Sequence, residues 1–161
     1  MDIKKYLDST YLKTAEQAGL SEEENREVVR TAVAEAITHG FKLIMIRPDM
    51  VKMARRMIAD AGSKVTVGTV IDFPLGNSPL EDKLTEASQA IQDGADDLDF
   101  VADYEAFKAG DTAKVKQQVL ECTRLGLENG RIVKWIIEVA ALNEHQIVQF
   151  CALIKNVVLS H

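Results

Sequence analysis

Segments that are typical of strands alternate with segments that are typical of helices along the whole chain, and this alternation limits the possible folds more than any other feature. Short apolar or β-branched runs predict five strands, and apolar residues that recur every three or four positions predict the helices between them. The predicted strands are Tyr6–Thr10, Leu43–Ile46, Lys64–Ile71, Asp97–Val101 and Ile132–Glu138. Strands that alternate with helices form parallel sheets with right-handed crossovers, so we expect an α/β fold.

Capping residues mark several of the predicted helix ends. Ser21 and Glu24 have the spacing of a capping box, Asp111 is placed to cap a later helix, and Gly40 ends the first long helix. The final predicted helix has its apolar side at Ile147, Cys151, Ile154 and Val158. Because Cys122 also lies in a helical pattern, we expect two reduced thiols in the core rather than a disulfide.

A doubly wound sheet and part of a (β/α)8 barrel both fit this order of elements. The length of 161 residues favours the doubly wound sheet, because a complete barrel takes about 250 residues. Strand chemistry favours the barrel, because the two-residue period of a strand places Lys134 and Glu138 on one face and Trp135 on the other. Charged side chains on one face suit a barrel interior with a polar site. The alternative is that Lys134 and Glu138 form a structural ion pair.

The excess of acidic residues argues against nucleic acid or an anionic membrane as the main partner. Nineteen Lys and Arg against 25 Asp and Glu give a formal net charge of -6, and the basic residues form no cluster. No apolar run approaches the roughly 20 residues that span a bilayer, and the first residues do not resemble a signal peptide. We therefore expect a cytoplasmic protein. Its three histidines and two cysteines are scattered, which predicts no metal site.

Four short strings carry a resemblance to a known family. They are Asp8-Ser9-Thr10, Thr69-Val70-Ile71-Asp72-Phe73-Pro74-Leu75-Gly76, Gly94-Ala95-Asp96-Asp97-Leu98-Asp99 and Val133-Lys134-Trp135-Ile136-Ile137-Glu138. In order and spacing they resemble the deoxyribose-phosphate aldolase family, over essentially all 161 residues. The resemblance implies a (β/α)8 TIM barrel, of which this chain holds about the first five β/α units as one partial domain over residues 1–161. We therefore expect a parallel sheet whose strands are neighbours in chain order, with Trp135 packed under the helices.

The resemblance also implies an activity and its residues. Members of the family are class I aldolases that reversibly cleave 2-deoxy-D-ribose 5-phosphate into acetaldehyde and D-glyceraldehyde 3-phosphate. They use a lysine Schiff base and no metal or organic cofactor. The implied partner is a small phosphorylated sugar or an aldehyde, with no nucleic acid and no membrane. Asp99 falls on the position of the family's proton-relay aspartate, and Asp8, Thr10 and Lys134 fall on positions that line the same cavity.

Other parts of the family pattern do not occur in this sequence. The family's Schiff-base lysine lies in a Lys-Thr-Ser-Thr-Gly strand and a second lysine precedes a Pro-x-Gly-Gly turn, and neither string occurs in the 161 residues. Ser9 stands where the family usually has His, Met45 where it often has Cys, and Arg47 where Asn is common. Nearby carboxylates favour the protonated form of a lysine. We therefore expect Lys134 to be an accessory lysine, the sequence to stop before the sixth strand, and the 161-residue chain alone to be inactive.

Two further functions fit the sequence. Five strands cannot close an eight-stranded barrel, so a non-catalytic partial barrel would cover its strand edges by self-association. The same edges predict a homo-oligomer for an aldolase of this length. An unrelated doubly wound binding protein would need a glycine-rich phosphate turn, and neither G-x-G-x-x-G nor G-x-x-x-x-G-K-[ST] occurs.

Overall fold

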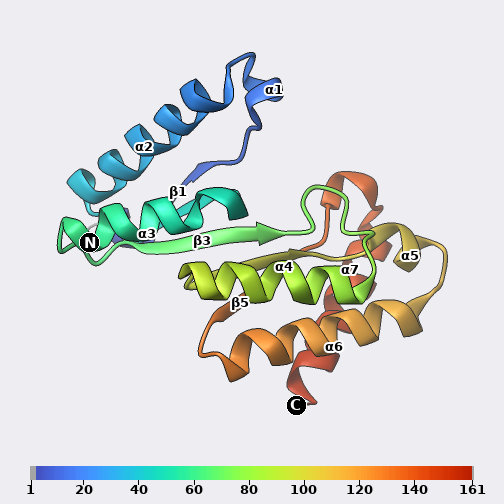
Figure 1. The fold of residues 1–161 in the computed structure, drawn as a ribbon. Coiled ribbons are helices and arrows are strands. Elements are labelled where there is room, and N and C mark those ends of the chain that lie inside the picture. Colours follow the sequence, from blue (N-terminus) through green and yellow to red (C-terminus); the bar gives the residue numbers. More distant parts are fainter. Residues whose placement is uncertain (1–2, 161) are drawn as a thin grey trace. The chain divides into compact units, whose positions relative to one another are not determined.

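The computed structural model describes residues 3–160 and contains five strands in one sheet (Figure 1). The strands are β1 (Asp8–Tyr11), β2 (Leu43–Ile46), β3 (Thr66–Ile71), β4 (Asp97–Val101) and β5 (Ile132–Ile136). Neighbours in the sheet follow the order β1-β2-β3-β4-β5, and β2 pairs in parallel with both β1 and β3. The predicted α/β fold and the predicted strand order are confirmed.

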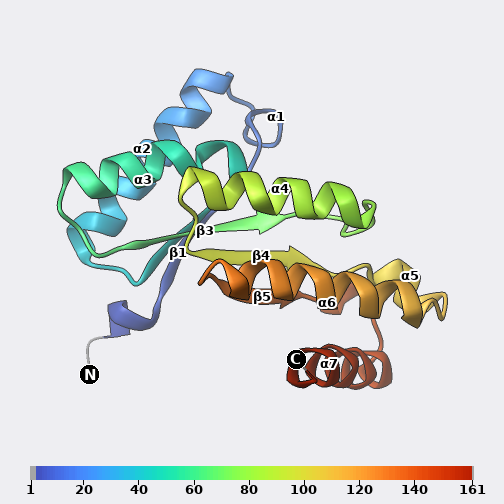
Figure 2. The same cartoon turned by 60° about the horizontal axis from the view of Figure 1, so that its bottom comes forward.

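Helices follow the strands in turn (Figures 1 and 2). The α-helices are α1 (Ala15–Ala18), α2 (Glu22–His39), α3 (Val51–Asp60), α4 (Leu80–Asp93), α5 (Tyr104–Lys108), α6 (Thr112–Glu128) and α7 (Glu144–Leu159). Three 3-10 turns complete the order: η1 (Ile3–Tyr6), η2 (Pro48–Met50) and η3 (Val139–Ala141). The predicted caps are confirmed, because Ser21 and Glu24 bond each other's backbone at the start of α2, and Asp111 accepts from the Lys114 amide at the start of α6.

The chain contacts divide it into two compact units. Unit 1 contains Met1–Val70 and Ala90–Asp97, and unit 2 contains Ile71–Gln89 and Leu98–His161. The single domain expected over residues 1–161 stays a prediction.

Unit 1 has an apolar core between its strands and the helices α2 and α3. Every residue of β2 is buried, together with apolar side chains of the two helices: Val29, Val33, Ala36, Val51, Ala54 and Ile58. Thr10 is paired with Met45, whereas Tyr11 is paired with Ile46 and donates its hydroxyl hydrogen bond to Asn25 of α2. Thr10 and Met45 therefore lie on the face of the sheet that is turned away from α2.

Unit 2 packs β5 and the end of β4 against α6 and α7 (Figure 2). The Trp135 ring stacks on Phe100 with ring centroids 5.2 Å apart, and its Nε1 donates a 3.1 Å hydrogen bond to Thr123 Oγ1 of α6. Gly126 of α6 lies so close to β5 that a Cβ there would overlap the Val133 side chain. Trp135 thus packs under a helix, as predicted.

The expectation of two core thiols is wrong for one of the two cysteines. Cys122 is fully buried in α6, but Cys151 is exposed, and its neighbour Phe150 is the buried residue of α7. Phe150 stacks on Phe107 with ring centroids 4.2 Å apart, and this contact fixes which side of α7 faces the core. Successive residues of a helix are about 100° apart, so Cys151 is turned toward solvent.

Candidate active site

Asp99 and Lys134 form the pair at the centre of the candidate site. Lys134 Nζ lies 3.1 Å from Asp99 Oδ1, which joins the middle of β4 to the middle of β5 within unit 2. The Asp99 side chain is 17% exposed and that of Lys134 39% exposed, so solvent still reaches the ion pair. The structure therefore brings together two of the four residues that the resemblance assigned to one cavity.

The alternation of side chains along the two strands explains this pairing. Phe100 and Trp135, each next in sequence to one member of the pair, stack on each other on the side that faces α6. Because neighbouring strand residues point to opposite faces, Asp99 and Lys134 lie on the face away from α6. The separation of Lys134 and Trp135 onto opposite faces is confirmed.

The pair has the chemistry of an acid–base couple rather than of a nucleophile. A carboxylate 3.1 Å from an ammonium stabilises the protonated amine, and only a neutral amine attacks a carbonyl. A partly exposed carboxylate beside a proton donor can accept a proton from a substrate hydroxyl and return it to carbon. The geometry thus suits proton transfer at Asp99, with Lys134 as its charged neighbour.

Asp8 and Thr10 lie on β1 in unit 1, where both are exposed. They are two residues apart on one strand, so they share a face, and the pairing of Thr10 with Met45 identifies it as the face away from α2. Ser9 points to the opposite face, and Arg47 follows directly after β2. The proposed roles of Asp8 and Thr10 stay predictions.

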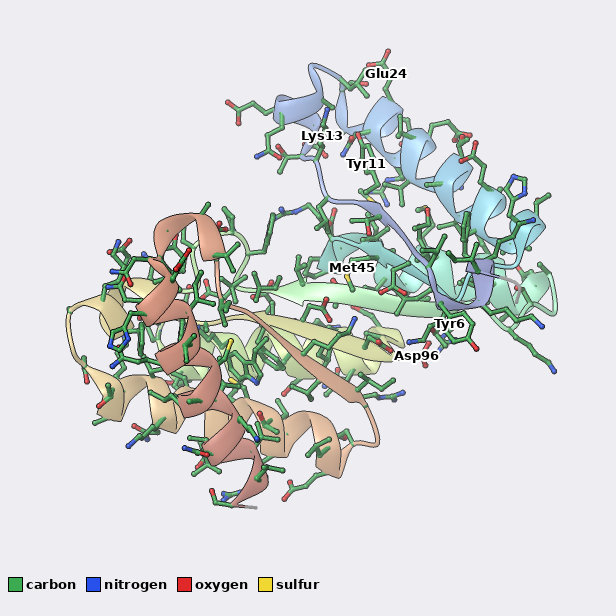
Figure 3. The ribbon with its side chains drawn as sticks, turned by 180° about the vertical axis from the view of Figure 1, so that it is seen from behind. Tyr6, Tyr11, Lys13, Glu24, Met45 and Asp96 are labelled. Atoms are coloured by element: carbon green, nitrogen blue, oxygen red, sulfur yellow. The ribbon has the colours of Figure 1, made fainter. Side chains whose placement is uncertain are left out.

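Unit 1 also contains a polar cavity that the sequence did not predict. Its volume is about 220 Å³, and it lies on the helix side of β1, where Tyr11, Lys13, Asn25 and Arg47 contribute to its lining. The Tyr11 hydroxyl donates a 2.7 Å bond to Asn25 Oδ1, and Asn25 Nδ2 donates to the Lys13 carbonyl at 3.3 Å. Figure 3 shows Tyr11 and Lys13 on the segment that leaves β1 toward α1. Asp8 and Thr10 are not among the residues that line this cavity.

The loop between β3 and α4 is held by a polar network in unit 2. Asp72, with φ of 57°, accepts from the Ser78 hydroxyl at 2.6 Å and from the Ser78 amide at 2.9 Å, and its own amide donates to Glu86 at 2.8 Å. Lys83 lies beneath the loop, fully buried, with its Nζ 3.2 Å from Asp72 Oδ2. Burial lowers the pKa of Lys83, and the charge of Asp72 acts against that shift.

The sequence contains a signal that Lys83 is buried, although Lys83 belongs to no known catalytic motif. Lys83 is three residues after Leu80 and four before Ala87, so it lies on the apolar side of the predicted helix. A lysine at such a position is normally excluded from a core unless its ammonium finds partners. Its presence there could have pointed to a buried polar network.

The described residues hold neither a metal cluster nor a membrane-spanning helix. Among residues 3–160, no group of three or more His, Cys, Asp and Glu side chains is arranged to hold a metal ion. Within the same residues, no helix combines the length and the apolarity that crossing a membrane requires.

Comparisons with known proteins agree on one family. The model of the DeoC/LacD family aldolases matches residues 8–147. A deoxyribose-phosphate aldolase of Thermococcus gammatolerans is 38% identical over 97% of this chain and 66% of its own length, and one of Thermococcus kodakarensis is 36% identical over 96% and 66%. The chain therefore spans just under two thirds of the length of these curated relatives.

Solved structures show the same similarity. A putative deoxyribose-phosphate aldolase from Coccidioides immitis superposes with a TM-score of 0.81 at 29% identity, covering 97% of this chain and 57% of that one. The deoxyribose phosphate aldolase from Aeropyrum pernix, which is described as tetrameric, superposes with a TM-score of 0.76 at 27% identity, covering 96% of this chain and 58% of that one.

Proposed function

The chain belongs to the DeoC/LacD family of aldolases, and from that premise we propose that it serves the reversible cleavage of 2-deoxy-D-ribose 5-phosphate into acetaldehyde and D-glyceraldehyde 3-phosphate through a lysine Schiff base. The names of its relatives support this substrate. The observation that carries the proposal is the 3.1 Å pair of Asp99 and Lys134 on the face of β4 and β5 away from α6. We also propose that the chain acts in the cytoplasm, in the breakdown of deoxyribonucleotides.

In the proposed mechanism, an amine condenses with the sugar aldehyde, and the resulting imine accepts the electron pair of the breaking carbon–carbon bond. Asp99 accepts the proton of the hydroxyl group on the carbon that becomes the aldehyde of glyceraldehyde 3-phosphate. The same carboxyl group then protonates the enamine carbon, and hydrolysis of the imine releases acetaldehyde. No metal or organic cofactor takes part in this proposal.

Lys134 is not the amine that forms the Schiff base in this proposal. Its ammonium is held against Asp99, whereas a nucleophilic lysine has to lose its proton. The family's Lys-Thr-Ser-Thr-Gly strand does not occur in the 161 residues. We therefore propose that residues 1–161 supply the proton relay, with Asp8 and Thr10 as further residues of the substrate cavity, and that the nucleophile comes from outside them.

Self-association completes the proposal. The relative from Aeropyrum pernix is described as tetrameric, and in this chain β1 and β5 end the strand order. Near the β5 end of unit 2, Leu127 is 56% exposed and Ile132 50% exposed, which leaves apolar surface for a second copy to cover.

Borohydride trapping tests the assignment of the nucleophile. The 161-residue chain is incubated with acetaldehyde and sodium borohydride, digested and examined by mass spectrometry. A solvated lysine with a pKa near 10.4 is only about 0.04% neutral at pH 7, so we expect slow labelling of surface lysines and no stoichiometric adduct. A stoichiometric adduct on Lys134 would show that Lys134 is itself the nucleophile.

The second arm uses an extended polypeptide, made by joining residues 1–161 to the remaining strands of a family member that carries the Lys-Thr-Ser-Thr-Gly strand. We expect it to gain one reduced adduct on the lysine of that strand and to cleave 2-deoxyribose 5-phosphate. If it forms no adduct and cleaves no substrate, the proposed function is wrong.

A further inference from the structure

We propose that Lys83 is a positioning residue, whose buried ammonium ties the β3–α4 loop to the end of β4 and thereby holds Asp99 in place. This inference rests on the proposed role of Asp99. The partners of Lys83 are Gly76, Val101 and Asp72 rather than Asp99 or Lys134, so its effect is transmitted through the backbone of β4.

The partners of Lys83 come from three separate points of unit 2. Its Nζ donates to the Gly76 carbonyl at 2.7 Å and to the Val101 carbonyl at 2.9 Å, and lies 3.2 Å from Asp72 Oδ2. A lysine ammonium has three donors, so these three acceptors satisfy it completely. The side chain is fully buried, and an ammonium is stable there only with such a set of partners.

The β3–α4 loop, which accepts a hydrogen bond from Lys83, approaches β4 closely. Gly76 has φ of 67°, and a Cβ there would lie 2.6 Å from the Ala102 carbonyl oxygen and 2.8 Å from that of Val101. The loop backbone therefore rests directly on the end of β4, where no larger side chain fits. Gln118 Nε2 of α6 donates to the Ser78 carbonyl at 3.1 Å, which supports the loop from the helix side.

The hydrogen bond from Lys83 reaches β4 close to the pair of Asp99 and Lys134. Val101, which accepts from Lys83, is two residues after Asp99 on β4. The next amide, that of Ala102, donates a 2.9 Å bond to the carbonyl of Ile136, which is two residues after Lys134 on β5. Fixing the end of β4 therefore fixes the positions of Asp99 and Lys134 relative to each other.

A labelling experiment on the 161-residue chain tests this without requiring activity. Lys83→Met keeps the length of the side chain and removes all three donors. The double variant Lys83→Met/Asp72→Asn also removes the charge that the single variant would leave buried, so it folds more readily. Thermal unfolding and the fluorescence of Trp135, the only tryptophan, report on folding and on the contact with β4.

The readout is the rate at which an amine reagent labels Lys134, followed by mass spectrometry. We expect a three- to tenfold faster rate in the folded double variant, because a displaced β4 carries Asp99 away from the Lys134 ammonium. Lys108, which is paired with Glu105 at 2.9 Å in α5, is the matched control and should keep its rate. An unchanged Lys134 rate in a folded variant overturns the proposal. Failure of both variants to fold also overturns it, because Lys83 would then be required by the fold itself.

Kinetics of the extended polypeptide supply a second readout. We expect Lys83→Met/Asp72→Asn to lower kcat at least tenfold with KM within threefold of the wild type, because the substrate still binds while the proton relay is displaced. Equal changes in kcat and KM, or none, would contradict a positioning role. If the wild-type extended polypeptide has no activity, the proposed function fails, and the labelling of Lys134 still decides the role of Lys83.

Discussion

At the scale of single residues, local geometry explains what could be predicted and tertiary packing explains what could not. The resemblance placed Asp99 and Lys134 in one cavity, and the alternation of strand residues explains why the two side chains form an ion pair on one face. The buried position of Lys83 depends on acceptors from Gly76 and Val101, which no local pattern brings together. Cys151 was predicted in the core but is exposed. The stacking of Phe150 on Phe107, rather than hydrophobic periodicity alone, sets the rotation of α7 about its axis.

The two cysteines should differ sharply in their reaction with iodoacetamide. Burial raises the pKa of the Cys122 thiol to about 12, so almost no thiolate is present at pH 8, and the side chain is also inaccessible. Cys151 is exposed. We expect Cys151 to be alkylated at least about 100-fold faster in the folded chain, measured by mass spectrometry.

Unfolding in guanidinium is the control, since both thiols should then react at similar rates. Raising the pH from 8 to 9 should not make Cys122 reactive, because the pKa of its thiol lies well above both pH values and the thiol stays protonated. Rapid alkylation of Cys122 in the folded chain would show that α6 is not packed as described.

At the scale of elements, the strands and the long helices were predictable, whereas the shortest helices and the end of the last strand were not. The strand over Asp97–Val101 was predicted with its observed bounds, whereas the last strand ends at Ile136 rather than Glu138. Glu138 has φ of 50°, a left-handed conformation that cannot continue a strand. The helices α1 and α5, with four and five residues, were missed because they are too short for a helical period.

The packing of α6 on β5 makes Gly126 sensitive to substitution by any larger residue. A Cβ at Gly126 would overlap Val133, so Gly126→Ala should lower the free energy of unfolding by about 1–3 kcal/mol despite the better helix propensity of alanine. Chemical denaturation measures the change.

The double variant Gly126→Ala/Val133→Ala is the matched control for this overlap. Removing the Val133 methyl groups creates room for the new Cβ, so the cost of Gly126→Ala should fall to below about 0.5 kcal/mol when it is measured in the Val133→Ala background. If Gly126→Ala costs the same in both backgrounds, steric overlap with β5 is not its cause.

At the scale of the whole molecule, the family and the strand order followed from the sequence, but the apolar surface that we expect a second copy to cover did not. The four strings that carry the resemblance occur in strands and in the loops next to them. The exposed apolar surface at Leu127 and Ile132 carries no such pattern. The structure is needed to show that Leu127 and Ile132 are exposed, because the exposure of a side chain depends on which neighbours in the fold cover it.

Sedimentation and light scattering should detect self-association at micromolar concentration. Large apolar surfaces and strand edges rarely remain uncovered, so we expect a species of at least twice 17.8 kDa. Leu127→Glu/Ile132→Lys should shift the equilibrium toward monomer, with Val148→Lys on exposed α7 as the control. A stable monomer of 17.8 kDa in the unmodified chain would contradict the expected oligomer.

The most direct test of the proposed function is the cleavage of 2-deoxyribose 5-phosphate by the extended polypeptide, followed as release of acetaldehyde, with and without Asp99→Asn. The variant keeps the shape of the side chain and removes its ability to relay a proton. We predict that the unmodified polypeptide cleaves the sugar phosphate and that Asp99→Asn lowers kcat by about 10²–10⁴-fold, while the unfolding temperature changes by less than about 3 °C. Asp82→Asn, on the exposed side of α4, should leave kcat unchanged. Undiminished turnover in folded Asp99→Asn would contradict the proton-relay role of Asp99.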